Sequence, residues 1–351
     1  MTTIRDVAEL ANVSIATVSR VLNGSGYVSP ELEQRVRQAV ADLDYDLNVQ
    51  WRHPHEELTI GVLVPGGNPF FEEVVRGVEE VADERGVRVV MCHTGLDSLR
   101  AAGYANILRQ HRITGFVVIS PDNVAQHWQR LLDQNFPLVL VDRSVDGIDA
   151  DTVVSDNHGG AAAAVSHLIT LGHRRIGFVT GLLHMESARA RLAGAKDTLV
   201  QAGIPFEPSL VYDKGDFLST SGYAGAETLF SNPEPPTAIF AFNDLMALGV
   251  LYCAYAHGIA VPQQLSVVGF DDIALSAYFV PGLTTVSQPK YELGRNVAEI
   301  LLERIEGNRD PRIHQILPTK LVVRESTAPP GSMNDVAGAD DDPSGRTHVV
   351  A

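Results

Sequence analysis

From Leu58 onward, short β-rich runs alternate with longer amphipathic stretches. The runs with the apolar, β-branched character of buried strands are Leu58–Val64, Val87–Cys92, Gly115–Ser120, Leu138–Val141, Arg175–Thr180, Ala238–Phe242 and Ser266–Phe270. The helical runs between them are Phe70–Arg85, Asn157–Leu171, Ala188–Ala202, Thr220–Phe230 and Leu245–His257. Strands that alternate with helices build parallel sheets with helices on both faces. We therefore expect an α/β fold over most of the chain.

The same region divides into two similar halves near Asp156, which predicts two lobes joined by a hinge. In open parallel sheets, ligands bind beyond the carboxyl ends of the strands. We therefore expect an effector-binding and dimerisation domain over residues 58–328. Its expected N-lobe and C-lobe comprise about residues 58–157 with 288–316, and about residues 158–287 with 317–328.

Residues 329–351 are rich in Pro, Gly, Ser and Asp, and they include an acidic run at 340–342. Such a composition cannot bury enough apolar surface to fold, so we expect a disordered acidic tail. The tail lacks the heptad repeat of a tetramerising coiled coil. A homodimer is therefore the expected assembly.

Residues 1–46 form a separate segment with three short amphipathic runs. Thr3, Ser14 and Ser29 each precede one run and can cap it, and Pro30 suits the first turn of the third. The apolar residues recur at helical spacing, namely Ile4, Val7, Ala8 and Ala11, then Val18, Val21 and Leu22, then Leu32, Val36, Ala39, Val40 and Leu43. A tight turn between the first two runs would make a helix-turn-helix, which can place a helix in the DNA major groove. The same pattern also fits an ordinary three-helix core.

One short run favours DNA binding over that plain core. Residues 17–23 read Thr-Val-Ser-Arg-Val-Leu-Asn after Val13-Ser14, and residues 2–45 resemble the headpiece of the LacI/GalR family of transcription regulators. The segments Gly172–Phe178 and Val267–Asp272 resemble the sensor domain of the same regulators, which is similar to periplasmic sugar-binding proteins. The resemblance extends to about residue 328. It implies a sequence-specific repressor of transcription under allosteric control by a small effector.

The resemblance also implies which side chains read DNA. Ile15, Ala16 and Arg20 would be the base-reading positions in the major groove of a pseudo-palindromic operator. The planar fork of Arg20 can bind the O6 and N7 atoms of guanine, whereas Ile15 and Ala16 offer only apolar contact. The expected phosphate contacts are Thr3, Ser14, Thr17, Ser19 and Asn23.

The expected hinge, residues 47–57, departs from the family pattern. The motif Tyr-x-Pro-Asn keeps its Tyr and Asn but has Leu47 in place of Pro, and the Ala-Arg-x-Leu core of the hinge helix is absent. The segment is about two residues short, and Pro54 disfavours a helix at the residue before it. A flexible linker is the favoured interpretation. Trp51 or Leu47 could alternatively wedge into the minor groove.

Charge limits how strongly this chain can bind DNA. The net charge is −16, which argues against nonspecific binding to nucleic acid. Residues 1–46 hold four arginines and seven acidic residues, whereas residues 1–30 are neutral. Because affinity depends on neutralised phosphates, we expect the headpiece alone to bind weakly, with a shallow salt dependence.

Polar and aromatic residues follow the predicted strands at their carboxyl ends. The resemblance implies an effector site at the same positions, formed by Phe70, Asp142, Arg191, Phe217, Asn243, Asp271 and Gln288. Carboxylates, amides and a guanidinium can bind vicinal hydroxyls, and an aromatic ring can cover the apolar face of a sugar. A sugar or sugar derivative is therefore the expected effector.

Each of these positions also has a purely structural interpretation. Asp142 and Asp271 could cap the helices that follow them, and Phe70 and Phe217 are more often core residues than ligand platforms. Capping is the favoured role for Asp244, which follows Asn243 at a helix start.

Several classes of protein are excluded by what the sequence lacks. It shows no apolar stretch long enough to span a bilayer and no signal peptide, so a cytoplasmic location is expected. Cys92 and Cys253 lie in apolar or aromatic runs and are expected as buried free thiols. We expect no metal and no cofactor, because no Cys/His cluster has ligand spacing and no glycine-rich loop fits a phosphate site.

Two other functions compete with the regulator. The sensor fold would also suit a solute-binding protein for transport, but the missing signal peptide and the helix-turn-helix oppose it. The clustered carboxylates would suit acid–base catalysis. No nucleophile–base motif, metal set or cofactor loop accompanies them, so the chain is not expected to be an enzyme.

Overall fold

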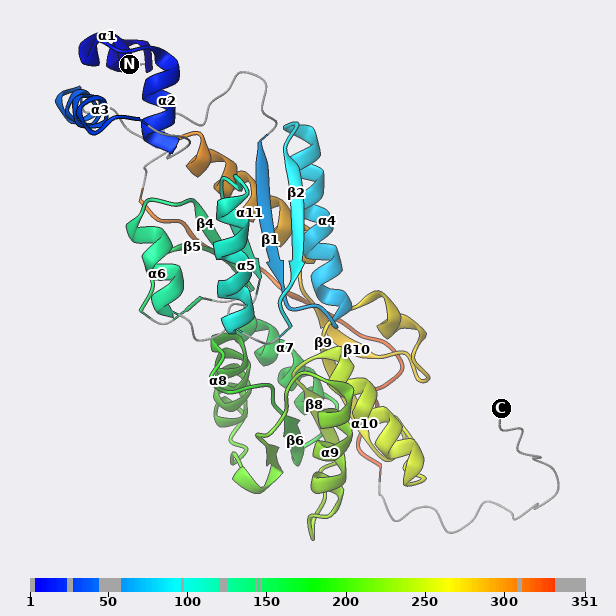
Figure 1. Ribbon diagram of the computed structural model, residues 1–351. Helices are drawn as coiled ribbons and strands as arrows, with labels where there is room; N and C mark the ends of the chain where they lie inside the picture. Colours follow the sequence, from blue (N-terminus) through cyan, green and yellow to red (C-terminus); the bar gives the residue numbers. More distant parts are fainter. Residues whose placement is uncertain are drawn as a thin grey trace. The chain divides into compact units, whose positions relative to one another are not determined.

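The computed structural model describes residues 4–23, 28–43, 58–95, 98–119, 125–142, 144–145, 147–307 and 311–331. The chain divides into two compact units, Met1–Glu57 and Leu58–Ala351 (Figure 1). The expected hinge at 47–57 and the tail from residue 332 lie outside the described residues. Both therefore remain predictions.

The first unit contains three helices around one small core (Figure 1). They are α1 (Ile4–Ala11), α2 (Ile15–Asn23) and α3 (Pro30–Asp42). The buried core residues are Val7, Ala8, Ala11, Val18, Val21, Val36 and Ala39. The predicted start of the third helix is confirmed, with Ser29 at its N-cap and proline in its first turn. Helical spacing of small apolar residues thus accounts for this unit.

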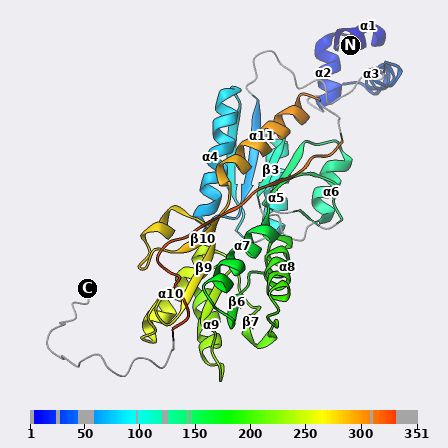
Figure 2. The same ribbon diagram turned by 180° about the vertical axis from the view of Figure 1, so that it is seen from behind.

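The N-lobe of the second unit is a six-stranded sheet in the order β11-β5-β4-β3-β1-β2. Its strands are β1 (Thr59–Val64), β2 (Arg88–His93), β3 (Phe116–Ile119), β4 (Leu138–Val141), β5 (Asp151–Ser155) and β11 (His314–Leu317). All its pairings are parallel. The helices α4 (Pro69–Glu84) and α11 (Lys290–Ile305) pack together on one face, and α5 (Ser98–Gln110) and α6 (Ala125–Asp133) cover the other (Figure 2).

The C-lobe repeats this plan with the strand order β12-β10-β9-β8-β6-β7. Its strands are β6 (Ile176–Val179), β7 (Val211–Tyr212), β8 (Ala238–Ala241), β9 (Ser266–Asp271), β10 (Thr284–Ser287) and β12 (Lys320–Val322). The helices α7 (Asn157–Thr170) and α8 (Glu186–Gln201) form one pair, and α9 (Ser219–Phe230) and α10 (Asp244–Ala256) form another. The predicted α/β fold with parallel sheets is confirmed, apart from one edge strand, because β12 runs antiparallel to β10.

The chain passes between the two sheets three times. The crossings lie between β5 and α7, between β10 and α11, and between β11 and β12. Figure 2 shows the stretch after α11 running along both lobes. Short crossings of this kind act as a hinge, because a few residues at element ends can absorb a change in lobe angle.

Candidate DNA-reading helix and effector site

The N-terminus of α2 is capped as predicted. The Thr17 amide donates to Ser14 Oγ at 3.1 Å, and the two hydroxyl oxygens lie 2.9 Å apart. Ile15 is 45% exposed and Arg20 is also exposed, so both are open to a partner. Ser19 is half-buried. Thr3 and the side chains of Ala16 and Asn23 lie outside the described part of the chain.

The turn before α2 is held from the third helix. Arg35 Nη2 donates to the carbonyl oxygens of Ala11 at 2.5 Å and Asn12 at 3.1 Å. Asn12 has a φ of 52°, the left-handed conformation that a tight turn requires. The positive guanidinium also lies at the negative end of α1, which favours it further. Arg35 thus acts inside the headpiece and sets the geometry of the helix-turn-helix.

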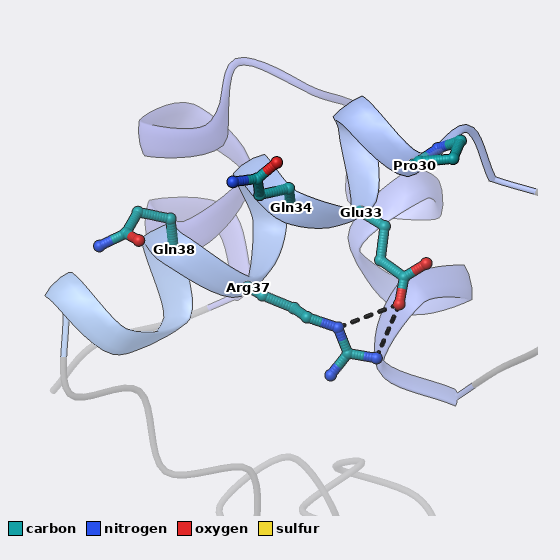
Figure 3. A pocket seen from close by; sticks show the side chains of 5 residues that line it. All are labelled: Pro30, Glu33, Gln34, Arg37 and Gln38. Carbon is teal, nitrogen blue, oxygen red and sulfur yellow. Dashed lines mark hydrogen bonds and ion pairs between the residues drawn. The ribbon is translucent and has the colours of Figure 1, made fainter.

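A second arginine of α3 is also engaged within the headpiece. Arg37 Nη2 lies 2.8 Å from Glu33 Oε1, one helical turn away (Figure 3). This pair lines a shallow surface hollow of about 350 Å³ with Pro30, Gln34 and Gln38. The hollow is open and polar, and it holds none of the residues expected to bind an effector.

The predicted effector residues Asp271 and Gln288 meet where β9 and β10 end. Gln288 Nε2 donates to Asp271 Oδ1 at 2.7 Å. Asn68, at the start of α4 in the N-lobe, donates from Nδ2 to Asp271 Oδ2 at 3.3 Å. Lys290 Nζ donates to the Asp271 carbonyl oxygen at 2.7 Å. One buried carboxylate therefore binds groups from both lobes.

Arg191 reaches the same region from α8 and is only 3% exposed. Its Nε donates to Asn157 Oδ1 at 2.8 Å, and its Nη1 donates to the Phe242 carbonyl oxygen. The guanidinium carbon lies 3.8 Å from the centre of the Phe270 ring. Burial lowers the pKa of Arg191, while the nearby carboxyl groups, Asp271 first among them, oppose that shift. The guanidinium is thus rigidly held before any ligand arrives.

Two carboxyl groups here are buried close enough to influence each other. Burial raises the pKa of Asp271 to about 6, although Arg191 and the amide donors counteract it. Burial and the charge of Asp271 raise the pKa of Asp244 well above its usual range. Asp244 accepts from Thr285 Oγ1 and from the Ile273 amide at 2.8 Å. It thereby holds the loop that follows Asp271.

The expectation that Asp244 caps α10 is wrong. The cap is Asn243, whose Oδ1 accepts from the Met246 amide at 2.8 Å. The Nδ2 of Asn243 donates to the Phe217 carbonyl oxygen at 2.9 Å. An asparagine can serve both groups because its amide carries a donor and an acceptor.

The two predicted ring platforms differ in burial. Phe70 is 2% exposed and belongs to the N-lobe core. Phe217 is half-buried, and a Cβ placed on Gly181 would lie 2.0 Å from its ring. Gly181 therefore allows the Phe217 ring to lie directly on the backbone after β6.

Backbone strain concentrates at these positions. Positive φ angles occur at Asp142 (75°), Phe217 (67°), Asp271 (122°) and Asp272 (54°). Such angles are uncommon outside glycine, and for a bulky residue such as Phe217 they are genuine outliers. Strain of this kind collects at functional sites, where the surrounding structure enforces it. Three of the predicted effector residues share this feature, which no sequence pattern revealed.

Several functional neighbours were not predicted from the sequence. Asn157 was expected only as a helix start, and Phe270 only as a strand residue, yet both hold Arg191. Asn68, just before Phe70, was not among the expected effector residues, yet it binds Asp271. Its side chain also caps α4 by accepting from the Phe70 amide. Only the tertiary contacts distinguish such residues from ordinary caps and core.

The remaining reactive side chains have structural roles. Cys253 is a buried free thiol, as expected, and burial raises its pKa to about 11. Cys92 is also free but only half-buried, which corrects the expectation of burial there. His173 lies in the C-lobe, bonded to Thr237 Oγ1 at 2.8 Å and to the Ala328 carbonyl oxygen at 2.9 Å. Burial lowers the pKa of His173.

Within the described ranges, no group of three or more His, Cys, Asp or Glu side chains could hold a metal ion. Among the helices so described, none is long and apolar enough to cross a bilayer.

Comparison with known proteins accounts for both units. Residues 3–48 match the family model of bacterial regulatory proteins of the lacI family, and residues 165–327 match a periplasmic binding protein-like domain. The HTH-type transcriptional repressor PurR of Aliivibrio salmonicida is 36% identical over 331 residues, covering 93% of this chain and 99% of the relative.

Solved structures agree with this assignment. A complex of the transcriptional regulator CelR with cellobiose has a TM-score of 0.70 and 34% identity, covering 93% of this chain and all of the other. The lac repressor dimer bound to operator and the anti-inducer ONPF has a TM-score of 0.70 and 30% identity, covering 93% and 99%. This chain therefore belongs to the lacI family of bacterial transcriptional repressors.

Proposed function

We propose that a sugar or sugar derivative, bound between the two lobes, controls this repressor. As a member of the family, the chain is a DNA-binding transcriptional repressor controlled by a small molecule, and its relatives are not enzymes. The proposed effector residues are Phe70, Asp142, Arg191, Phe217, Asn243, Asp271 and Gln288. The observation that carries the proposal is the buried carboxylate of Asp271, which accepts hydrogen bonds from both lobes.

A sugar hydroxyl is chemically able to replace the amide donors on Asp271. Asn68 supplies the donor from the N-lobe, so its displacement would free the two lobes to take a new angle. An effector shifts operator affinity only through its different affinities for the two lobe arrangements, typically by about 1–3 kcal/mol. The complex of CelR with cellobiose supports a sugar as the ligand class.

Operator binding followed by fluorescence anisotropy tests the effector. We expect at least one sugar to change the operator affinity of the full chain by about tenfold, and Asp271→Ala to abolish that response. Asp197→Ala is the matched control, since Asp197 is an exposed carboxylate of the same lobe, paired with His158. If no sugar changes operator affinity, the sugar proposal fails.

The DNA contacts are proposed at the helix-turn-helix. Ile15, Ala16 and Arg20 would read bases, and Thr3, Ser14, Thr17, Ser19 and Asn23 would bind phosphates. The exposure of Ile15 and Arg20 and the capped start of α2 support this assignment. The lac repressor dimer on its operator supports the same mode of binding.

Arg20→Ala is the direct test of the reading helix. We expect it to lower discrimination between operator and a mutated operator by about 1–3 kcal/mol in competition gel shifts. Arg37→Ala removes the same charge from α3 and should leave discrimination unchanged, because Arg37 pairs with Glu33. Equal discrimination by the Arg20 variant and the wild type would show that another residue reads the bases.

The salt dependence follows from the same charges. Because Arg35 and Arg37 are engaged inside the headpiece and Arg20 is assigned to the bases, phosphate neutralisation falls mainly on Arg5. Two such arginines in a dimer predict that log K falls against log salt with a slope of about −2, at about 0.9 per neutralised phosphate. A slope twice as steep would require additional basic contacts.

We also propose that the chain acts as a homodimer in the cytoplasm, where a repressor has access to its operator. The helix α10 exposes Leu248, Tyr252 and Tyr255 at helical spacing, so they share one face. Tyr278 and Val280 are exposed after β9, at 81% and 95%. Exposed aromatic patches of this kind mark interfaces. Sedimentation should give a dimer, and Tyr252→Lys should weaken it.

A further inference from the structure

We infer that the effector is uncharged and presents hydrogen-bond donors to Asp271 and Gln288, so that the site rejects phosphorylated and carboxylated compounds. The inference rests on the proposed function, because it specifies the ligand of the same site. It states which ligands the site excludes as well as which ligands it binds.

Hydrogen-bonding chemistry determines how the Gln288 side chain is oriented toward Asp271. A carboxylate can only accept, so the amide nitrogen of Gln288 must face Asp271 Oδ1. Gln288 Oε1 is then left buried without a hydrogen-bond partner among the described residues, in a side chain that is 3% exposed. A buried acceptor without a donor carries a free-energy penalty that a ligand O–H or N–H would remove. Gln288 Oε1 therefore calls for a ligand donor, and the neighbouring Asp271 carboxylate can accept a second one, because each of its oxygens can accept more than one hydrogen bond.

Among the described residues, the two cations near Asp271, Arg191 and Lys290, are already engaged by the protein. Arg191 donates to Asn157 and to the Phe242 carbonyl oxygen, and it stacks on Phe270. Lys290 Nζ lies 2.7 Å from the carbonyl oxygen of Asp271 and 2.8 Å from that of Asp272. An incoming phosphate would have to take these donors away from their present partners.

Several carboxyl groups face those cations in the described part of the site. Asp271, Asp142 and Glu186 act electrostatically on Arg191, whereas the raised pKa of Asp244 disfavours the charged form of that group. Asp271 also feels the charge of Asp142 directly. A dianionic ligand placed among these groups would meet repulsion in a poorly solvated site, where like charges interact strongly. A neutral polyol replaces amide donors with hydroxyl donors and adds no charge.

Matched pairs of ligands test the inference on the full chain by isothermal titration calorimetry. The pairs are ribose and ribose 5-phosphate, glucose and glucose 6-phosphate, glucose and gluconate, and adenosine and its 5′-monophosphate. In any pair of which at least one compound binds, we expect the neutral compound to bind at least 100-fold more tightly than the anionic one. An anionic member that binds as tightly as its neutral partner overturns the inference, as does a panel in which no neutral compound binds.

Two variants separate charge from shape. Asp271→Asn keeps the size of the side chain but removes the charge, so we expect the preference for the neutral member to fall at least tenfold. Asp197→Asn removes an exposed carboxylate from the same lobe and should leave the preference unchanged. Equal preference in the Asp271 variant and the wild type would overturn the inference.

Measuring operator affinity separates a failure of this inference from a failure of the proposed function. If a phosphorylated sugar binds and changes operator affinity, the sugar-gated repressor stands and the charge selection falls. If neutral sugars bind selectively but leave operator affinity unchanged, the charge selection stands and the effector role falls.

Discussion

Replacing Asp271 with asparagine should stabilise this protein at neutral pH. Asp271 is 3% exposed, and burial raises the pKa of its carboxyl group from 3.8 to about 6. A raised pKa means that the folded chain disfavours the ionised form. The wild type therefore loses stability as the pH rises from below 3.8 to above 6, because folding must hold a charge that the unfolded chain solvates freely. The asparagine variant has no such charge.

The size of the gain follows from the pKa difference. Each pKa unit corresponds to about 1.4 kcal/mol, so a shift of about two units is worth about 3 kcal/mol well above pH 6. Near pH 4.5 the folded carboxyl group is mostly protonated, and the same linkage leaves only about 1 kcal/mol. The amide donors of Asn68 and Gln288 reduce the gain somewhat, since they lose a charged acceptor.

Urea unfolding of the wild type and the variant at about pH 8 and about pH 4.5 measures the effect. The difference in the free energy of unfolding should favour the variant at the higher pH and shrink at the lower. Asp272→Asn is the control with the opposite sign. Burial acts against the charge of Asp272 too, but the hydrogen bond from Arg324 at 2.7 Å, together with the charges of Arg324 and Lys290, lowers its pKa. That variant should lose stability at the higher pH.

One result would refute the reasoning. If Asp271→Asn is less stable than the wild type at about pH 8, then Asp271 stabilises the fold, as a capping residue would. In that case the buried charge of Asp271 is not a destabilising feature kept for ligand binding. Capping residues typically contribute about 1 kcal/mol of stability, which is opposite in sign to the gain predicted here. The sign alone decides between the two roles.

Three further predictions follow from buried contacts elsewhere. Asp151→Ala should cost about 3–5 kcal/mol in urea unfolding, because it leaves the buried Arg304, now 2.7 Å from Asp151, without its partner; a smaller loss for Asp151→Ala than for Arg312→Ala would contradict this. Arg35→Ala should speed amide hydrogen exchange at the helix-turn-helix. It should also weaken operator binding by about 1 kcal/mol without changing the sequence preference. Slower exchange would argue against a role of Arg35 in holding the turn. Gly294→Ala should separate α4 from α11 and lower the melting temperature, because its Cβ would lie 1.9 Å from a backbone oxygen of α4. Gly307→Ala is the comparison: its Cβ would meet open space at a φ of 101°, so this variant tests backbone strain alone.

The sequence predicted β1 to β4, β6, β8 and β9, but it missed β5 and β10 inside the sheets as well as β7, β11 and β12. Leu138–Val141 and Ala238–Ala241 are apolar strands whose character is visible in isolation. Strands β11 and β12 read as ordinary polar or mixed segments, and β7 has two residues. They are strands because a neighbour supplies their hydrogen bonds, which is a tertiary cause. The helices α5, α6 and α11 were likewise not assigned.

The candidate site shows the same division. Arg191 and Asp271 were expected from the resemblance to the LacI/GalR family, and the structure places both in one buried cluster. The partners that fix their chemistry come from Asn68 and Asn157, far away in the sequence. No local pattern distinguishes these asparagines from helix caps. Their roles became visible only when the strands ended at a common edge.

The sequence by itself determined three short helices and a long α/β region, because periodicity and turn chemistry act over a few residues. The likeness of residues 17–23 to the LacI/GalR headpiece then favoured a helix-turn-helix. Only the tertiary structure decided the state of the effector site. It buried Asp271 beside Arg191, left Gln288 Oε1 without a donor and imposed positive φ angles on Asp142 and Phe217. The physical reason is that burial, charge coupling and backbone strain depend on which distant segments are brought together. Those three effects determine which ligand such a site can accept.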